Sequence, residues 1–227
     1  MFAPLMAVVL LGAHFFYFVP PEGWLPARPQ SVSTCVQIGF IGQGKTQFHP
    51  SLNLAIEETQ ASLKEYVRAV KAIHLAQVGT KWLDLGAFQM RAGAGRLIQL
   101  EISSPLGPQC VMQALFVQGG RAYILTGACL KEELLTFRST FIDSFCSFTE
   151  IPDLLAPVDD LVHKEILQRC LGSLGRFPLE GDRTALQEEQ WQELQALVAK
   201  VGVSLGGYWQ FLVLQEGYQK IHAHDRS

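Results

Sequence analysis

The chain has 227 residues, of which 48% are hydrophobic and 17% are charged, and its formal net charge is −3 at pH 7. This length suits one large domain, or one domain with an appendage, and it can bury a core without metal or disulfide bridges. A charged fraction below the roughly 25% of average soluble domains indicates a partly apolar surface, typical of a protein that meets a partner, a second copy or a membrane. The acidic balance, with no basic stripe, argues against nucleic-acid binding.

The N-terminal segment Leu5–Val19 is hydrophobic, and no Lys or Arg precedes Arg28. It is shorter than the ~20 residues that a membrane-spanning helix needs. A secretory signal has a basic start, and a lipoprotein signal has a cysteine where this sequence has His14, so neither signal is well formed. We expect residues 1–16 to be a degenerate signal, a short anchor or a buried strand. The compartment, bacterial cell envelope or cytoplasm, stays open.

Seven segments have the composition or the apolar–polar alternation of β-strands. In chain order they cover residues 17–24, 35–41, 52–58, 81–88, 96–103, 110–118 and 122–126. Gly119-Gly120 between the last two segments predicts a tight hairpin turn.

Two helices interrupt and close this series of strands. Ser62, with Glu65 three residues later, predicts a capping box at the start of a helix that ends near Gly79. A second helix is expected over residues 131–148, with apolar side chains along one side. The order β-β-β-α-β-β-β-β-α predicts an α+β domain, in which an antiparallel sheet has flanking helices.

The character of the sequence changes after Pro152. Residues 159–171, 184–201 and 205–221 have helical patterns, so we expect an α-helical appendage over residues 150–227. Its last helix carries Trp209, Phe211 and Tyr218, which are candidates for docking a partner. Packing in the core of a helical hairpin is the commoner role of such residues.

One short motif has the pattern of a phosphate loop. Residues 39–46 match G-x-x-x-x-G-K-[ST], which makes Gly44, Lys45 and Thr46 candidates for binding the phosphates and Mg²⁺ of a nucleotide. A phosphate loop leads directly into a helix. Here Pro50 and the alternating residues 51–58 predict a strand, so we expect a glycine-rich hairpin, with nucleotide binding as the alternative.

No other arrangement of residues points to catalysis. The five cysteines include no C-x-x-C pair and are interpreted as small buried residues. His74, near the end of the first helix, is interpreted as a helix-terminal cation. We therefore expect no catalytic residues, no metal site and no cofactor.

Several phrases, in this order and spacing, resemble the PsbP/DcrB-like family over residues 17–149. They are residues 18–24 (FVPPEGW), 48–54 (FHPSLNL), 62–66 (SLKEY), 119–126 (GGRAYILT) and 141–148 (FIDSFCSF). The resemblance implies a PsbP-like sandwich, a sheet with helices packed on both sides, and a non-catalytic role. The roles of its members differ widely, so the fold implies little about function.

Taken together, the sequence predicts a binding, adaptor or chaperone-like protein that contacts a protein partner through its sheet face or its helical appendage. An NTP-binding protein that uses residues 39–46 is one alternative. The other is a membrane-associated structural protein of the cell envelope, held through Leu5–Val19.

Overall fold

The computed structural model describes residues 15–27, 36–44, 47–177, 182–203 and 205–222. The chain divides into two compact units. Among the described residues, the first unit runs from 20 to 149, and the second joins residues 15–19 to residues 150–222. Residues 17–19, expected at the start of the sheet domain, are therefore part of the second unit.

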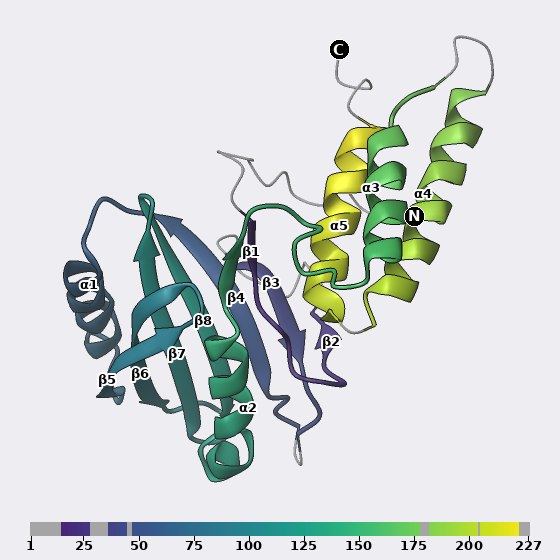
Figure 1. The fold of residues 1–227 in the computed structure, drawn as a ribbon. Coiled ribbons are helices and arrows are strands. Elements are labelled where there is room, and N and C mark those ends of the chain that lie inside the picture. The colour runs from purple at the N-terminus through teal and green to yellow at the C-terminus, as the bar shows by residue number, and fades with distance from the viewer. Residues whose placement is uncertain (1–14, 28–35, 45–46, 178–181, 204, 223–227) are drawn as a thin grey trace. The chain divides into compact units, whose positions relative to one another are not determined.

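The first unit is built on a seven-stranded antiparallel sheet with the strand order β2-β3-β4-β8-β7-β6-β5. Its strands are β2 Leu25–Pro26, β3 Val36–Ile41, β4 Ser51–Glu58, β5 Lys81–Met90, β6 Gly93–Ile102, β7 Gln109–Gln118 and β8 Arg121–Leu130. Its helical segments are α1 Leu63–Leu75, the 3-10 turn Lys131–Glu133 and α2 Leu134–Cys146 (Figure 1). This architecture confirms the predicted α+β class.

Helix α1 begins at the predicted capping box. The Ser62 backbone N–H donates to the Glu65 carboxylate over 2.9 Å, and the Ser62 side chain accepts from the Glu65 N–H. The helix lies over β5, β6 and β7. Its buried Tyr66 packs in a cluster with Ile98, Leu115 and Ile124.

Helix α2 covers the opposite face of the same sheet. Phe141 and Phe145 on α2 are fully buried. Phe141 approaches β8 at Gly127, where a Cβ atom would lie 2.5 Å from the Phe141 ring. Because Ile124 and Gly127 are an odd number of residues apart on β8, they point to opposite faces. The two helices and the sheet therefore form the sandwich that the sequence predicts.

The prediction of a strand within residues 17–24 is wrong, since only Tyr17 lies in a strand and residues 18–24 connect two strands. Strand β1, Phe15–Tyr17, pairs with β9, Thr149–Ile151, in a separate two-stranded sheet. The seven-stranded sheet begins only at β2. Pro20 and Pro21 lie between the two strands, and proline has no N–H to donate to a strand ladder.

The second unit contains three helices, α3 Leu161–Ser173, α4 Arg183–Val201 and α5 Gly206–Ile221. Trp209 on α5 is fully buried, and its indole N–H donates to the Leu154 carbonyl over 2.7 Å. At Gly217 a Cβ atom would overlap the Leu194 side chain, so the glycine permits α4 and α5 to pack closely. The predicted helical appendage is thus a packed unit with its own core.

Residues 16–18 also belong to that core. Phe16, Tyr17 and Phe18 are buried, and the Phe18 ring lies 4.8 Å from the ring of Tyr208 on α5. The apolar side chains of residues 16–18 are therefore buried in the second unit. Residues 5–14 of the segment Leu5–Val19 lie outside the described residues. No helix in the described ranges has the length and apolar character needed to cross a membrane.

The contact between Gly127 and Phe141 gives a first prediction. Gly127→Ala should destabilise the protein by about 1–3 kcal/mol, because the added methyl group overpacks the interface between β8 and α2. In a Phe141→Leu background the same substitution should cost clearly less, because a smaller side chain leaves room. Urea denaturation of the four proteins measures this coupling. Equal costs in both backgrounds would contradict the packing described here.

Candidate protein-docking site

The two edges of the seven-stranded sheet differ in length and chemistry. At one edge, β2 has two residues and ends in Pro26, and both features discourage pairing with a further strand. At the other edge, β5 has ten residues, and no further strand lies beside it in the part of the chain that the structure describes. We call this strand the β5 edge.

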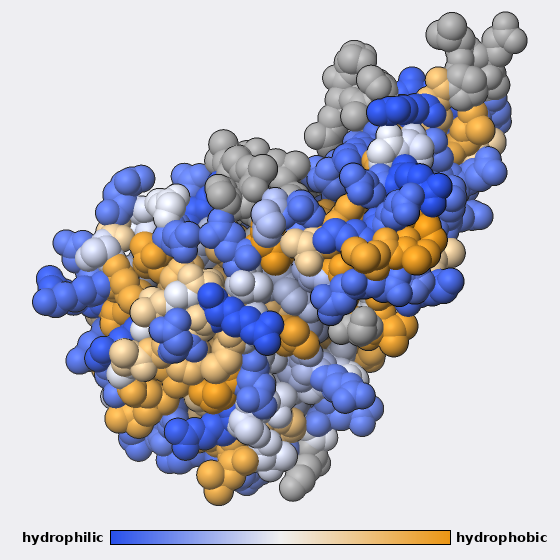
Figure 2. Space-filling model, in the orientation of Figure 1, coloured by the Kyte–Doolittle hydropathy of each residue, from blue (hydrophilic) through white to orange (hydrophobic). Residues whose placement is uncertain are grey.

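The β5 edge is rich in apolar side chains. Trp82, Leu83, Leu85, Ala87 and Phe88 lie within its ten residues. Leu83 is 52% exposed, whereas Phe88 is half-buried and packs edge-on against Phe145 with 6.4 Å between ring centroids. Figure 2 shows hydrophobic surface on the side of the first unit where β5 runs between α1 and α2. A long, exposed, apolar edge strand is a template for pairing with another chain.

The end of α1 extends this apolar surface. Ile73 and Leu75 in its last turn are exposed, and so is Val78 in the connection that leads to Lys81. Exposed aliphatic residues at single positions are ordinary, but a group beside an edge strand marks a surface suited to contact.

The charges of the β5 edge are paired within the sheet. The Arg96 guanidinium donates two hydrogen bonds of 2.7 Å to the Asp84 carboxylate, and the Gly86 N–H donates a third of 3.0 Å. The bonds from Arg96 hold the pKa of Asp84 below its ordinary value. Natural edge strands use unpaired charges to repel other strands. Here Asp84 is compensated and repels less.

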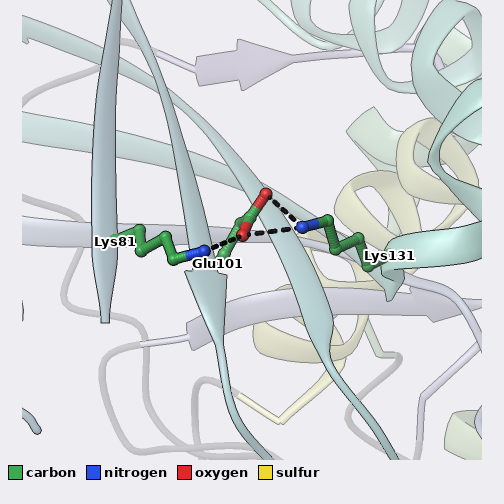
Figure 3. Close-up of polar contacts among 3 residues, drawn as sticks. All are labelled: Lys81, Glu101 and Lys131. Atoms are coloured by element: carbon green, nitrogen blue, oxygen red, sulfur yellow. Dashed lines mark hydrogen bonds and ion pairs between the residues drawn. The ribbon is translucent and has the colours of Figure 1, made fainter. Parts of the chain in front are cut away.

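Lys81, at the start of β5, is also compensated. Its Nζ lies 3.2 Å from the Glu101 carboxylate, which also receives Lys131 Nζ at 2.9 Å (Figure 3). The hydrogen bonds from Lys131 and Lys81 lower the pKa of Glu101. We call these three side chains the Glu101 network.

A bulge divides the β5 edge. The register with β6 shifts between Asp84 and Gly86, so Leu85 has no partner in the ladder. Gly86 has a φ of 102°, which suits glycine. An incoming strand would therefore pair with residues 81–84 or with residues 86–90, and not across the bulge.

The aromatic residues proposed for docking do not form one exposed stripe. Trp209 is fully buried, so it packs in the core of the second unit, which is the commoner of the two roles considered for it. Phe211 is half-buried and stacks near Tyr208 at 6.5 Å. Tyr218 is 46% exposed and stacks on His222 at 4.1 Å, which leaves it as the accessible member of the set.

The glycine-rich motif leads into a strand. Strand β4 begins at Ser51 and runs antiparallel to β3, and the Gly42 N–H donates to the Pro50 carbonyl over 2.8 Å. Lys45 and Thr46 lie outside the described residues, whereas Gly44 is half-buried beside the Phe48 carbonyl. The helix N-terminus that a phosphate loop requires is replaced by the extended β4.

His74 lies in the last turn of α1, where the sequence predicts a helix-terminal cation. Burial lowers the pKa of its imidazole, which lies 6.1 Å from the Trp82 ring, so the neutral form is favoured. Within the described residues, no group of three or more His, Cys, Asp or Glu side chains is arranged to hold a metal ion.

Sequence reasoning missed the β5 edge as a site. Residues 81–88 were predicted as a strand, but the prediction did not say which strands lie at the edges. The available signal was the apolar character of both faces of this segment, where a half-buried strand would alternate.

Comparisons with solved structures identify the fold. No protein-family model matches the sequence, and no curated protein resembles it in sequence. LpqN of Mycobacterium tuberculosis, a protein involved in cell envelope biogenesis, is similar with a TM-score of 0.50 and 13% identity, over 63% of this chain and 86% of LpqN. Together with the order of strands and helices, this similarity shows a PsbP-like α+β fold.

Two further structures are similar at lower scores. Cyanobacterial PsbP (CyanoP) from Synechocystis sp. PCC 6803 has a TM-score of 0.44 and 14% identity, over 66% of this chain and 100% of that protein. PA94 from Pseudomonas aeruginosa, a protein of unknown function and putative regulator, has a TM-score of 0.42 and 11% identity, over 60% and 96%.

The Asp84–Arg96 pair predicts a dependence of stability on pH. Because the pKa of Asp84 is lowered in the folded state, its contribution is present above the unfolded value of about 3.9 and is lost as the pH falls through the folded pKa. The urea midpoint of wild type should therefore exceed that of Asp84→Asn above about pH 5, and the difference should shrink towards pH 2. Arg96→Gln should weaken this pH dependence. A difference that grows on acidification would overturn the assignment.

The strand after the glycine-rich loop predicts no stabilisation by nucleotides. A ligand at a hundred times its Kd would stabilise the folded protein by about 2.7 kcal/mol. We expect saturating Mg-ATP and Mg-GTP to leave the melting temperature unchanged in a thermal-shift scan. A stabilisation that disappears in Lys45→Ala would show that this prediction is wrong.

Proposed function

We propose that the chain is a non-catalytic protein-binding module, whose sheet receives an extended segment of a partner protein along the β5 edge. The observation that supports this proposal most directly is the difference between the two edges of the sheet. One edge ends in a two-residue strand with a proline, and the other ends in ten residues rich in apolar side chains.

Strand addition suits the chemistry of this edge. Backbone N–H and C=O groups of an added strand give affinity, and alternate side chains give selectivity. Leu83 offers an exposed apolar contact on the α2 side of the sheet, and Ala87, beyond the bulge, is exposed as well. The pairing of Asp84 with Arg96 and of Lys81 with Glu101 reduces the charge that would oppose an incoming strand.

The partner segment that fits is apolar and extended. Exposed Leu75 and Val78 lie shortly before the start of β5, so residues 81–84, which include exposed Leu83, adjoin further exposed aliphatic side chains. A partner strand beside this stretch would bury Leu83 on the α2 side of the sheet, and its alternate side chains could cover Leu75 and Val78 on the α1 side; burying aliphatic surface favours association.

Site-specific photo-crosslinking tests the proposal. A benzophenone side chain placed at position 83 should give discrete adducts with a partner in extracts of the native host, because the position faces the proposed strand. The same group at Leu161, an exposed leucine of similar size on α3, serves as the matched control. We expect adducts at position 83 that are absent at position 161.

A charge on the edge provides the second arm of this test. Leu83→Lys should abolish the adducts formed by a benzophenone at position 78, an exposed position shortly before the stretch 81–84, because lysine on an edge strand opposes pairing. Leu161→Lys should leave them unchanged. Both residues are exposed, so each change should alter stability by less than about 0.5 kcal/mol. Adducts that survive Leu83→Lys, or that appear equally at position 161, would overturn the proposal.

A further inference from the structure

Cys110 and Cys129 are directly opposed on neighbouring strands. The β7–β8 ladder runs without a bulge from the pair Gln118–Arg121 to the pair Gln109–Leu130, and it places Cys110 opposite Cys129. Opposed residues project from the same face of a sheet. Both thiols are free and buried.

The spacing of this pair suits a disulfide bond. Gly119 and Gly120 both have positive φ, which makes their turn type I′ and makes Gln118–Arg121 a hydrogen-bonded pair. Cys110 lies an even number of residues from Gln118, so its pair is also hydrogen-bonded, with Cα atoms about 5.5 Å apart. Disulfides span Cα distances of roughly 4.4–6.8 Å.

The pair also lies beside the Glu101 network. Glu101 is opposite Cys110 on β6, and Lys131 follows Cys129 by two residues, directly after β8. The ion pair of 2.9 Å between Glu101 and Lys131 therefore reaches from β6 to the end of β8, across the strand that carries Cys110 (Figure 3).

We propose that Cys110 and Cys129 form a reversible dithiol–disulfide couple that reacts with low-molecular-weight disulfides of the glutathione type. The register of the β7–β8 ladder places each of these two thiols opposite the other. Cys146 and Cys170 lie on α2 and α3 and so have no cysteine opposite them in a strand ladder.

The reaction is two successive thiol–disulfide exchanges. The thiolate of one of the two cysteines attacks one sulfur of the oxidised glutathione disulfide, forms a mixed disulfide and releases one glutathione thiolate. The thiolate of the other cysteine then attacks the protein sulfur of this mixed disulfide and releases the second glutathione thiolate. Two electrons pass from the two cysteines to oxidised glutathione, which becomes two molecules of reduced glutathione as the two protons are transferred.

Burial controls the rate of this exchange. It raises the pKa of Cys110 to about 11 and that of Cys129 to about 12, so the thiolate fraction of both is small at neutral pH, and it limits the access of glutathione disulfide to both sulfurs. Glu101 also raises the pKa of Cys110, and Lys131 lowers it.

Strain in the Cys110–Cys129 disulfide makes its formation reversible. Opposed Cβ atoms lie about 4.5–5.5 Å apart, whereas a disulfide prefers about 3.5–4.5 Å, so the bond must draw β7 and β8 together. A strained disulfide is more easily reduced than a relaxed one.

Peptide mapping of the wild-type protein tests the proposal. Trypsin cleaves after Arg121, inside the hairpin turn, so a disulfide would join peptide 97–121 to peptide 122–131. After incubation with excess oxidised glutathione, we expect this joined pair by mass spectrometry, and its loss on adding dithiothreitol. Its rate of formation should rise about tenfold per pH unit from about pH 8 to about pH 10, in proportion to the thiolate fraction.

Two variants sharpen the test. Glu101→Gln should accelerate the reaction at fixed pH, because it removes a negative charge beside Cys110 and weakens the Glu101 network. Glu132→Gln, an exposed change on the adjacent 3-10 turn, should not. Circular dichroism confirms that each protein stays folded. Stable mixed disulfides with glutathione on Cys110 or Cys129, or no joined peptides from the folded protein at pH 10, would overturn the proposal.

Discussion

The register set by the Gly119-Gly120 turn is the constraint on which the first unit depends. Two successive glycines with positive φ close a two-residue turn, and ten residue pairs then follow between β7 and β8 without a bulge. Because side chains alternate along a strand, this register decides which residues meet α1 and which meet α2. It turns Ile124 towards one helix and Gly127 towards the other, and it also brings Cys110 opposite Cys129.

The Glu101 network connects the two proposals made here. Glu101 lies between Lys81 at the start of the β5 edge and Lys131 after β8, and its carboxylate receives both ammonium groups. Exposed ion pairs contribute little to stability, so the importance of this network lies in its position. It compensates a charge at the proposed docking edge and crosses the strand that carries Cys110. A change at Lys81 or at Lys131 therefore alters the surroundings of Glu101, which is also the partner of the other lysine.

The two edges of this open sheet are unequal, and only the β2 edge is protected against pairing with a further strand. Pro26 and a two-residue strand limit pairing beyond β2. At β5, the bulge at Asp84–Gly86 shortens each stretch that another strand can pair with, while Leu83 stays exposed. A bulge of this kind limits uncontrolled pairing without removing the apolar surface, which suits a surface that meets a selected partner.

The sequence by itself determined the local structure of this protein, because turns, caps and helical periodicity act over a few residues. It predicted the α+β class, the capping box at Ser62, the hairpin at Gly119-Gly120 and the strand after Pro50. The same hairpin also contained the Cys110–Cys129 pairing, since equal distances from a two-residue turn imply opposed positions. Only the tertiary structure decided that β5 lies at an edge, that Trp209 is buried, that burial lowers the pKa of His74 and that Phe18 packs with Tyr208. These properties depend on contacts between residues far apart in the chain, which local patterns do not specify.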